Sequence, residues 1–197
     1  VANQQRDEVE RDARTLKRML ARYKTASFDT WWKLSEGRPV VQRLAGILTL
    51  LRILGVDSKA SDKKLLSQYH ESLSRCESSK RLGIRDQSGI SGVRELVAAN
   101  LEREDIRIDR GRGQASVVIS VDYRVERVGR ETYVDATLWI RLRSAAGGLL
   151  SEFPIKARAV SLSGAVEGKR RAGQKLSSQL RGSLNESPLI DRLIDAA

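Results

Sequence analysis

The chain has 197 residues, and its 36 lysines and arginines outnumber 25 aspartates and glutamates, which gives a net charge of +11. With one cysteine, Cys76, and one histidine, His70, the composition excludes an internal disulfide and a metal site built from clusters of these residues. The basic excess favours acidic partners such as nucleic acid or anionic lipid. The excess of basic residues is spread almost evenly along the chain, however. An evenly spread charge is equally typical of a protein whose surface charge only keeps it soluble.

Residues 1–80 have the apolar spacing of helices. The first helix is predicted from steps of three and four residues, and it would pack in its own domain or pair with a partner helix. A nearly all-apolar helix over 40–54, starting near Pro39 and ending at Gly55, is expected at the centre of a bundle. Ser61 is the expected N-cap of a third helix. The first helix has Val9, Ala13, Leu16, Leu20 and Tyr23 on its apolar face, and the third has Leu65, Leu66, Tyr69, Leu73 and Cys76.

The most apolar segment, residues 40–56, contains Arg43 and Arg52 and is shorter than the roughly 20 residues that span a bilayer. The chain starts at Val1, and its only methionine is Met19. We therefore expect the native start to lie outside this sequence, with a signal peptide, lipid anchor or membrane helix removed. Membrane attachment is expected only through such a missing segment.

Polar and turn-forming residues between 77 and 89 predict a linker, and hence two domains over 1–80 and 81–197. In the second domain we expect a helix from about Ile90 to Leu101 and a short strand at 106–108. A long C-terminal helix is predicted from leucines and alanine at steps of four, followed by a short amphipathic turn after Pro188. The residues of that long helix are Ala172, Leu176, Leu180 and Leu184.

Three stretches between residues 116 and 160 alternate apolar and polar side chains. Because side chains alternate between the two faces of a strand, each stretch has one buried and one wet side. Together they predict an antiparallel meander of three long strands, plus the short one, flanked by two helices. The apolar sets are Val117, Ile119, Val121, Tyr123 and Val125; Val134, Ala136, Leu138, Ile140 and Leu142; and Phe153, Ile155, Ala157 and Ala159.

Catalytic and cofactor signals are missing from the sequence. His70 and Cys76 are six positions apart on one helix and therefore face different directions, which argues against a nucleophile pair. The acids are scattered singly, and Asp122 and Asp135 are expected to pair with arginines across the strands. No glycine-rich phosphate loop is present. We therefore expect no catalytic residues, no cofactor, no metal and no enzymatic activity.

The wet face of the meander carries Tyr133 and Trp139 beside Arg141 and Arg143. Aromatic residues next to arginines can stack single-stranded bases. Acids are nearly as numerous as basic residues on this face, which indicates cross-strand ion pairs or a surface covered by a partner. The alternative of nucleic-acid binding would use Arg110, Arg112, Arg143, Lys169, Arg170 and Arg171.

Two resemblances bear on the second domain. The order of a helix, three strands and a helix that begins with basic residues resembles the double-stranded RNA-binding domain. The strands here are longer than in that family, however, and its histidine-bearing loop between the first two strands is missing. Residues 92–184 resemble the globular domain of bacterial envelope lipoproteins of the curli-secretion and penicillin-binding-protein-activator type. The matching pieces are 96–101, 106–108, 115–121, 136–142 and 146–150. That resemblance implies a non-enzymatic accessory protein in the bacterial periplasm or envelope, and it brings no catalytic residues.

The sequence therefore predicts an α+β fold, with an N-terminal helical bundle and a sheet domain. The expected function is protein–protein interaction as an accessory, scaffold or assembly subunit, with a homo-oligomer as one form of it. The alternative is a basic RNA-binding module. The expected contact residues are Trp31, Trp32, Tyr133, Trp139 and Arg141.

Overall fold

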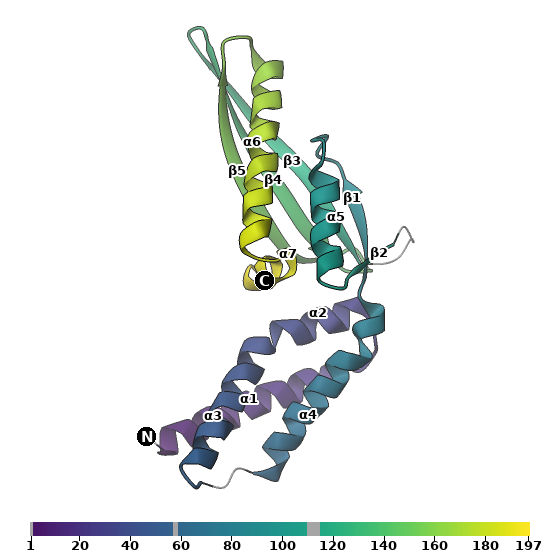
Figure 1. Ribbon diagram of the computed structural model, residues 1–197, viewed down its shortest axis with the longest axis vertical. Coiled ribbons are helices and arrows are strands. Elements are labelled where there is room, and N and C mark those ends of the chain that lie inside the picture. Colours follow the sequence, from purple (N-terminus) through teal and green to yellow (C-terminus); the bar gives the residue numbers. More distant parts are fainter. Residues whose placement is uncertain (1, 57–58, 110–114) are drawn as a thin grey trace. The chain divides into compact units, whose positions relative to one another are not determined.

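The computed structural model describes residues 2–56, 59–109 and 115–197 (Figure 1). Its contacts divide the chain into two compact units, residues 1–80 and residues 81–197. The first unit is helical, and the second combines a sheet with helices. The predicted α+β class is therefore confirmed.

The helical unit contains α1 (Ala2–Arg22), α2 (Phe28–Glu36), α3 (Arg38–Ile53) and α4 (Ala60–Arg75), followed by a short 3₁₀ turn at Glu77–Ser79. Helix α1 packs against α3 and α4. Pro39 lies in the first turn of α3, as predicted, because a proline there removes no helical hydrogen bond. The prediction of Ser61 as an N-cap was wrong. Helix α4 already includes Ser61, and the capping position is Lys59, whose side chain makes no capping bond.

The core of this unit contains two tryptophans that the sequence analysis expected on a contact surface. Trp31 and Trp32 are only 2% and 0% exposed. Trp31 packs on Phe28, with their ring centroids 5.3 Å apart, and Tyr69 donates a hydrogen bond from its hydroxyl to the Leu34 carbonyl oxygen at 2.7 Å. The two indoles therefore stabilise the bundle, and the expectation that they contact a partner is corrected.

The sheet unit has strands in the order β2-β1-β3-β4-β5. Strand β1 runs parallel to both β2 and β3, whereas β3, β4 and β5 are antiparallel, so the sheet is mixed. Its elements are β1 (Arg81–Asp86), α5 (Val93–Arg103), β2 (Arg107–Ile108), β3 (Ser116–Val128), β4 (Glu131–Arg143), β5 (Leu149–Ser161), α6 (Ala165–Glu186) and α7 (Leu189–Asp195).

Strand β1 occupies part of the segment that was predicted to be a linker, and that prediction was wrong. The strand inserts between β2 and β3, and it pairs Ile84 with Val117. Leu82 is fully buried. A parallel strand finds its partner far along the chain, so no hairpin turn marks it in the sequence. The predicted short strand, β2, pairs with β1 and not with the meander.

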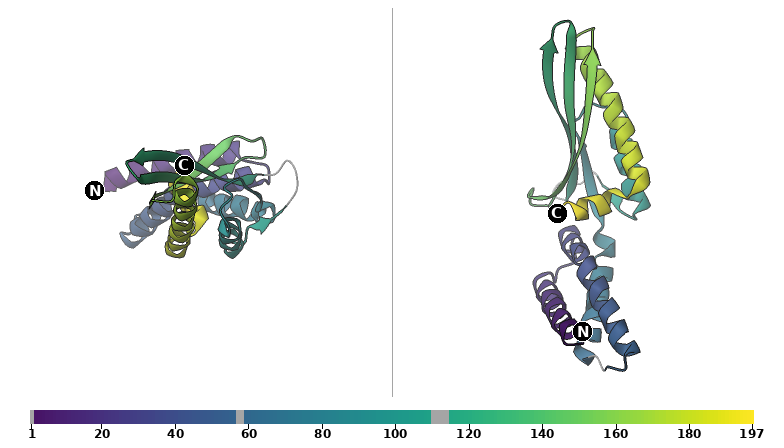
Figure 2. Two further views of the ribbon diagram at one scale, coloured as in Figure 1. Left: turned by 90° about the horizontal axis from the view of Figure 1, so that it is seen from above. Right: turned by 90° about the vertical axis from the view of Figure 1, so that its left-hand side faces the viewer.

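The three long strands have the predicted alternation except toward the end of β3, where Val125 was predicted to be buried but is 43% exposed. Val117 lies opposite Leu142, and Ile140 lies between Ile119 on β3 and Phe153 on β5. Helix α6 covers the apolar face of β4 and β5, and its predicted leucines are buried. In the right-hand view of Figure 2, the helices of this unit lie on one side of the sheet. The other face is left open, and it carries Trp139.

Candidate protein-binding face of the sheet

Trp139 lies near the centre of the open face, on the middle strand of the meander. Its neighbours across the strands are Ser120 on β3 and Pro154 on β5. The indole is half-buried, and Pro154 is exposed. The strand alternation that buries Leu138 and Ile140 under α6 turns Trp139 to the other face. An aromatic ring and a proline ring thus lie side by side on a surface without a helical cover.

Polar contacts fix the orientation of this indole. Its Nε1 donates a hydrogen bond to Asp122 Oδ2 at 2.8 Å, and the Arg141 guanidinium lies 4.8 Å from the ring centroid. Arg141 in turn donates to Glu152 Oε2 at 3.1 Å and to Ser120 Oγ at 3.2 Å. All three long strands contribute to this group. We call Trp139, Asp122, Arg141, Glu152 and Ser120 the indole network.

A similar group surrounds Tyr133 on the same face of β4. The Arg158 guanidinium lies 5.1 Å from the Tyr133 ring centroid and forms an ion pair with Asp135 at 3.3 Å. The Tyr133 hydroxyl donates to a carboxylate oxygen of Glu131, and this hydrogen bond raises the pKa of the phenol. The predicted pairing of Asp135 with an arginine is present. Asp122, by contrast, binds the Trp139 indole.

Three arginines of this face are engaged within the sheet unit, whereas Arg124 and Lys156 on the same face are exposed. Arg141 and Arg158 pair with carboxylates, and each lies over an aromatic ring. Arg143 donates to the carbonyl oxygen of Gly147 at 2.9 Å. On the ring faces where these guanidinium groups lie, a base could stack only by displacing an arginine, and a phosphate would compete with the carboxylates. The geometry therefore favours an aromatic contact surface over a phosphate-binding one.

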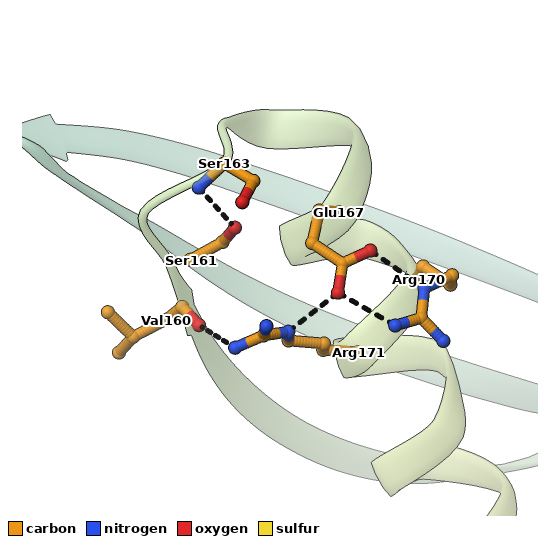
Figure 3. Close-up of polar contacts among 6 residues, drawn as sticks. All are labelled: Val160, Ser161, Ser163, Glu167, Arg170 and Arg171. Atoms are coloured by element: carbon orange, nitrogen blue, oxygen red, sulfur yellow. Dashed lines mark hydrogen bonds and ion pairs between the residues drawn. The ribbon is translucent and has the colours of Figure 1, made fainter.

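The basic residues at the start of α6 form a separate cluster (Figure 3). Glu167 accepts hydrogen bonds from Arg170 at 2.7 Å and from Arg171 at 2.8 Å, and these two guanidinium groups lower its pKa to about 2. Lys169 lies 5.4 Å from the ring centroid of Tyr123 on the helix-covered side of the sheet. The structure therefore does not bring residues 169–171 together with Arg141 and Arg143.

Two residues of the nucleic-acid alternative, Arg110 and Arg112, fall outside the described residues. Cys76 is buried, and burial raises the pKa of its thiol, whereas His70 is exposed. Within the described ranges there is no group of three or more histidines, cysteines and acids placed to bind a metal. No helix in this part of the chain has the length and apolar character needed to cross a membrane.

Sequence reasoning missed the contribution of Pro154. A proline inside an alternating stretch indicates an edge strand, and β5 is the edge of this sheet. That signal could have identified β5 as an edge strand from the sequence, but not the position of Pro154 opposite Trp139. The indole network itself depends on the register between strands, which alternation alone leaves open.

Comparisons with known proteins give partial likenesses. No family model and no curated protein matches the sequence. A minor lipoprotein from Acinetobacter baumannii is similar over 54% of this chain and 91% of its own, at 11% identity and a TM-score of 0.38. A PelC variant from Paraburkholderia phytofirmans, solved as a dodecamer, is similar over 51% of this chain and 87% of its own, at 15% identity and a TM-score of 0.25. Likenesses of this strength carry no argument about function, so the proposal below rests on the surface of the chain itself.

Proposed function

We propose that this chain is a non-enzymatic accessory or assembly subunit that binds a partner protein through the open face of its sheet. The observation that carries the proposal is the indole network, in which Trp139 is held in one orientation by Asp122 and Arg141. A rigid aromatic side chain loses little conformational entropy on binding, and tryptophan, tyrosine and arginine are the residue types that dominate protein interfaces.

Charge also supports a protein partner. The guanidinium groups beside Trp139 and Tyr133 are paired with Glu152 and Asp135 in the free chain. On this surface the aromatic rings of Trp139 and Tyr133 are surrounded by charged groups that are already paired. Protein interfaces have the same composition, with aromatic residues at the centre and polar residues at the rim. The location of this activity in the bacterial periplasm or envelope stays a prediction of the sequence resemblance.

The test is site-specific photo-crosslinking in the native host. A photoreactive residue replaces Thr137, which lies two positions from Trp139 on the same face of β4, and a matched one replaces the exposed Gln179 on α6. We expect a discrete protein adduct at position 137 that disappears in a Trp139→Ala background and persists with Trp139→Phe. Adducts of equal yield at both positions, or an adduct insensitive to Trp139→Ala, would contradict the proposal.

The nucleic-acid alternative is measured in parallel, by fluorescence anisotropy with short single- and double-stranded RNA and DNA. Salt is raised from about 50 to about 200 mM, because phosphate contacts weaken steeply over this range. We expect weak binding that is lost with salt and is unaffected by Trp139→Ala. Tight binding at the higher salt that falls with Lys169→Ala and Arg170→Ala would replace the proposed function with the alternative.

A further inference from the structure

Strand β3 continues past its neighbour β1 and leaves part of one edge unpaired. Strand β1 ends at Asp86, opposite Ile119, whereas β3 runs on to Val128. Among the described residues, β1 and β4 are the only strands that pair with β3. Figure 1 shows the tip of the β3–β4 hairpin beyond the end of β1. We call residues 121–128, on the side away from β4, the free edge of β3.

The backbone of the free edge has the groups that another strand would need. The Ile119 carbonyl oxygen accepts a hydrogen bond from the N–H of Gln87, directly after β1, at 2.7 Å. Backbone groups alternate in direction along a strand, so those of Tyr123, Val125 and Arg127 point to the same side as the Ile119 carbonyl. Such a row of N–H and C=O groups is a template for pairing with another chain.

The outer edge of β5 is protected in a way that the free edge of β3 is not. Pro154 interrupts β5, and Lys175 donates a hydrogen bond to the carbonyl oxygen of Arg158. Residues 121–128 contain no proline. The chain after β1 turns over the helix-covered face, because a Cβ added to Gly173 on α6 would be 3.5 Å from the Cγ1 of Ile90. This loop therefore leaves the plane of the sheet before it could cover the free edge.

We propose that the free edge pairs with the same edge of a second copy of this chain, antiparallel and across a two-fold axis. The axis passes beside Val125, which lies opposite Val125 of the second copy. Arg124 then lies opposite Glu126 of the second copy, and symmetry repeats this pair. Both side chains are exposed in the single chain. Opposite charges directly across two strands stabilise their pairing.

The helix-covered side of the sheet also fits this register. Val125 is 43% exposed although it belongs to the apolar set of β3, and contact with its own copy would cover it. Tyr123 lies opposite Arg127 of the second copy, whose aliphatic part can pack on the sheet while its charged end extends into solvent. Trp139 lies on β4 and stays open, so this proposal goes beyond the proposed function and does not depend on it.

Neighbouring registers fit less well. A shift by one residue would oppose backbone groups that point in different directions. A shift by two residues one way brings Arg124 opposite Arg124 and places Gly129 of the second copy beside Ile119, where the chain after β1 already binds. A shift by two residues the other way brings Glu126 opposite Glu126. Like charges directly opposite destabilise a pair of strands.

The first test is sedimentation velocity of the full chain over a range of concentrations. We expect a reversible dimer that is weak, because one pair of strand edges buries less area than a standard interface. Arg124→Glu should raise its dissociation constant at least ~10-fold, because both ion pairs become repulsive. Adding Glu126→Arg to this variant should restore the dimer. The matched control is Lys156→Glu, the same charge change at an exposed position on β5, which should have no effect.

The second test reads the register by disulfide formation. Opposite residues in a non-hydrogen-bonded antiparallel pair have Cα atoms about 4.5 Å apart, which permits a disulfide. Arg124 and Glu126 of the second copy form such a pair in the proposed register. A mixture of the Arg124→Cys and Glu126→Cys chains should therefore oxidise to a covalent dimer faster than either chain alone. The wild type measures the background from Cys76, which is buried.

Each contrary result overturns the proposal. A wild type that stays monomeric at its highest soluble concentration would show that the free edge does not pair. A dimer that tolerates Arg124→Glu, or that the reversed pair of charges does not restore, would use another surface. Cysteine variants that cross-link with themselves as fast as in the mixture would exclude the register. Circular dichroism of each variant confirms that its fold is unchanged.

Discussion

Gly168 on α6 lies against Val134 on β4 so closely that a Cβ at position 168 would be 2.6 Å from the Cγ2 of Val134. Both residues are buried at the contact between helix and sheet. Real Cβ atoms do not approach other carbons to this distance, so a side chain here would push the helix away from the middle strand. The glycine is required by packing, since it lies inside an α-helix, where any residue adopts the backbone angles.

Gly168→Ala should therefore destabilise the protein by about 1–3 kcal/mol, because overpacking outweighs the helix propensity that alanine adds. Urea denaturation measures the change. A Cβ added to Gly182 on the same helix would meet no atom within 4 Å, so Gly182→Ala is the matched control and should stabilise by up to about 1 kcal/mol. Equal effects of the two substitutions would show that the approach to Val134 is not tight.

Replacing a core tryptophan should lower the free energy of unfolding much more than replacing the tryptophan on the open face. Trp32→Ala removes a fully buried side chain and should cost about 3–5 kcal/mol of unfolding free energy. Trp139→Ala removes a half-buried ring on the open face and should cost far less. Thermal unfolding followed by circular dichroism compares the two. A larger loss for Trp139→Ala would make the indole network a structural element and remove the main support for the binding face.

Acid should weaken the Glu167 cluster in a defined pH window. The pKa of Glu167 falls from 4.5 to about 2 because Arg170 and Arg171 bind its charged form. A carboxyl group whose pKa is lowered in the folded state stabilises the fold above its unfolded pKa, and this contribution is lost as the pH falls through the folded value. The stability difference between wild type and Glu167→Gln should thus be constant above about pH 5 and shrink between about 4.5 and about 2. A titration of the Glu167 carboxyl group followed by ¹³C NMR measures its pKa directly. An ordinary glutamate pKa in the folded protein would contradict this prediction.

The outer edge of β5 should resist pairing with another strand. Lys175 donates to the Arg158 carbonyl oxygen at 2.8 Å, Arg171 donates to the Val160 carbonyl oxygen at 3.3 Å, and Pro154 has no N–H to offer. Pro154→Thr combined with Lys175→Ala should increase self-association in sedimentation velocity. Pro154→Thr combined with Lys175→Arg, which keeps a donor, should show a smaller increase. A double variant that associates no more than the wild type at high concentration would mean that this edge is not guarded by these residues.

Local patterns in the sequence were sufficient for the elements whose signal lies within a few residues. Alternation predicted which side of β3, β4 and β5 is buried, because successive side chains on a strand point to opposite faces whatever the partner strand is. Steps of three and four predicted α1 and α6 for the corresponding reason. Pro39 near the start of α3 and the open face carrying Trp139 could be predicted in the same way, since each depends only on neighbouring residues.

Tertiary structure decided the features that join distant residues. Strand β1 forms because it pairs with β2 on one side and β3 on the other. The amino-acid composition of residues 81–86 does not indicate this pairing. Trp31 and Trp32 are buried because the other helices close over them, whereas an exposed tryptophan pair would have the same sequence. Arg141 and Arg158 are neutralised by acids on a neighbouring strand, and the register that brings them together is set by the whole sheet. Pairing across strands and packing between helices are long-range, so only the folded chain determines them.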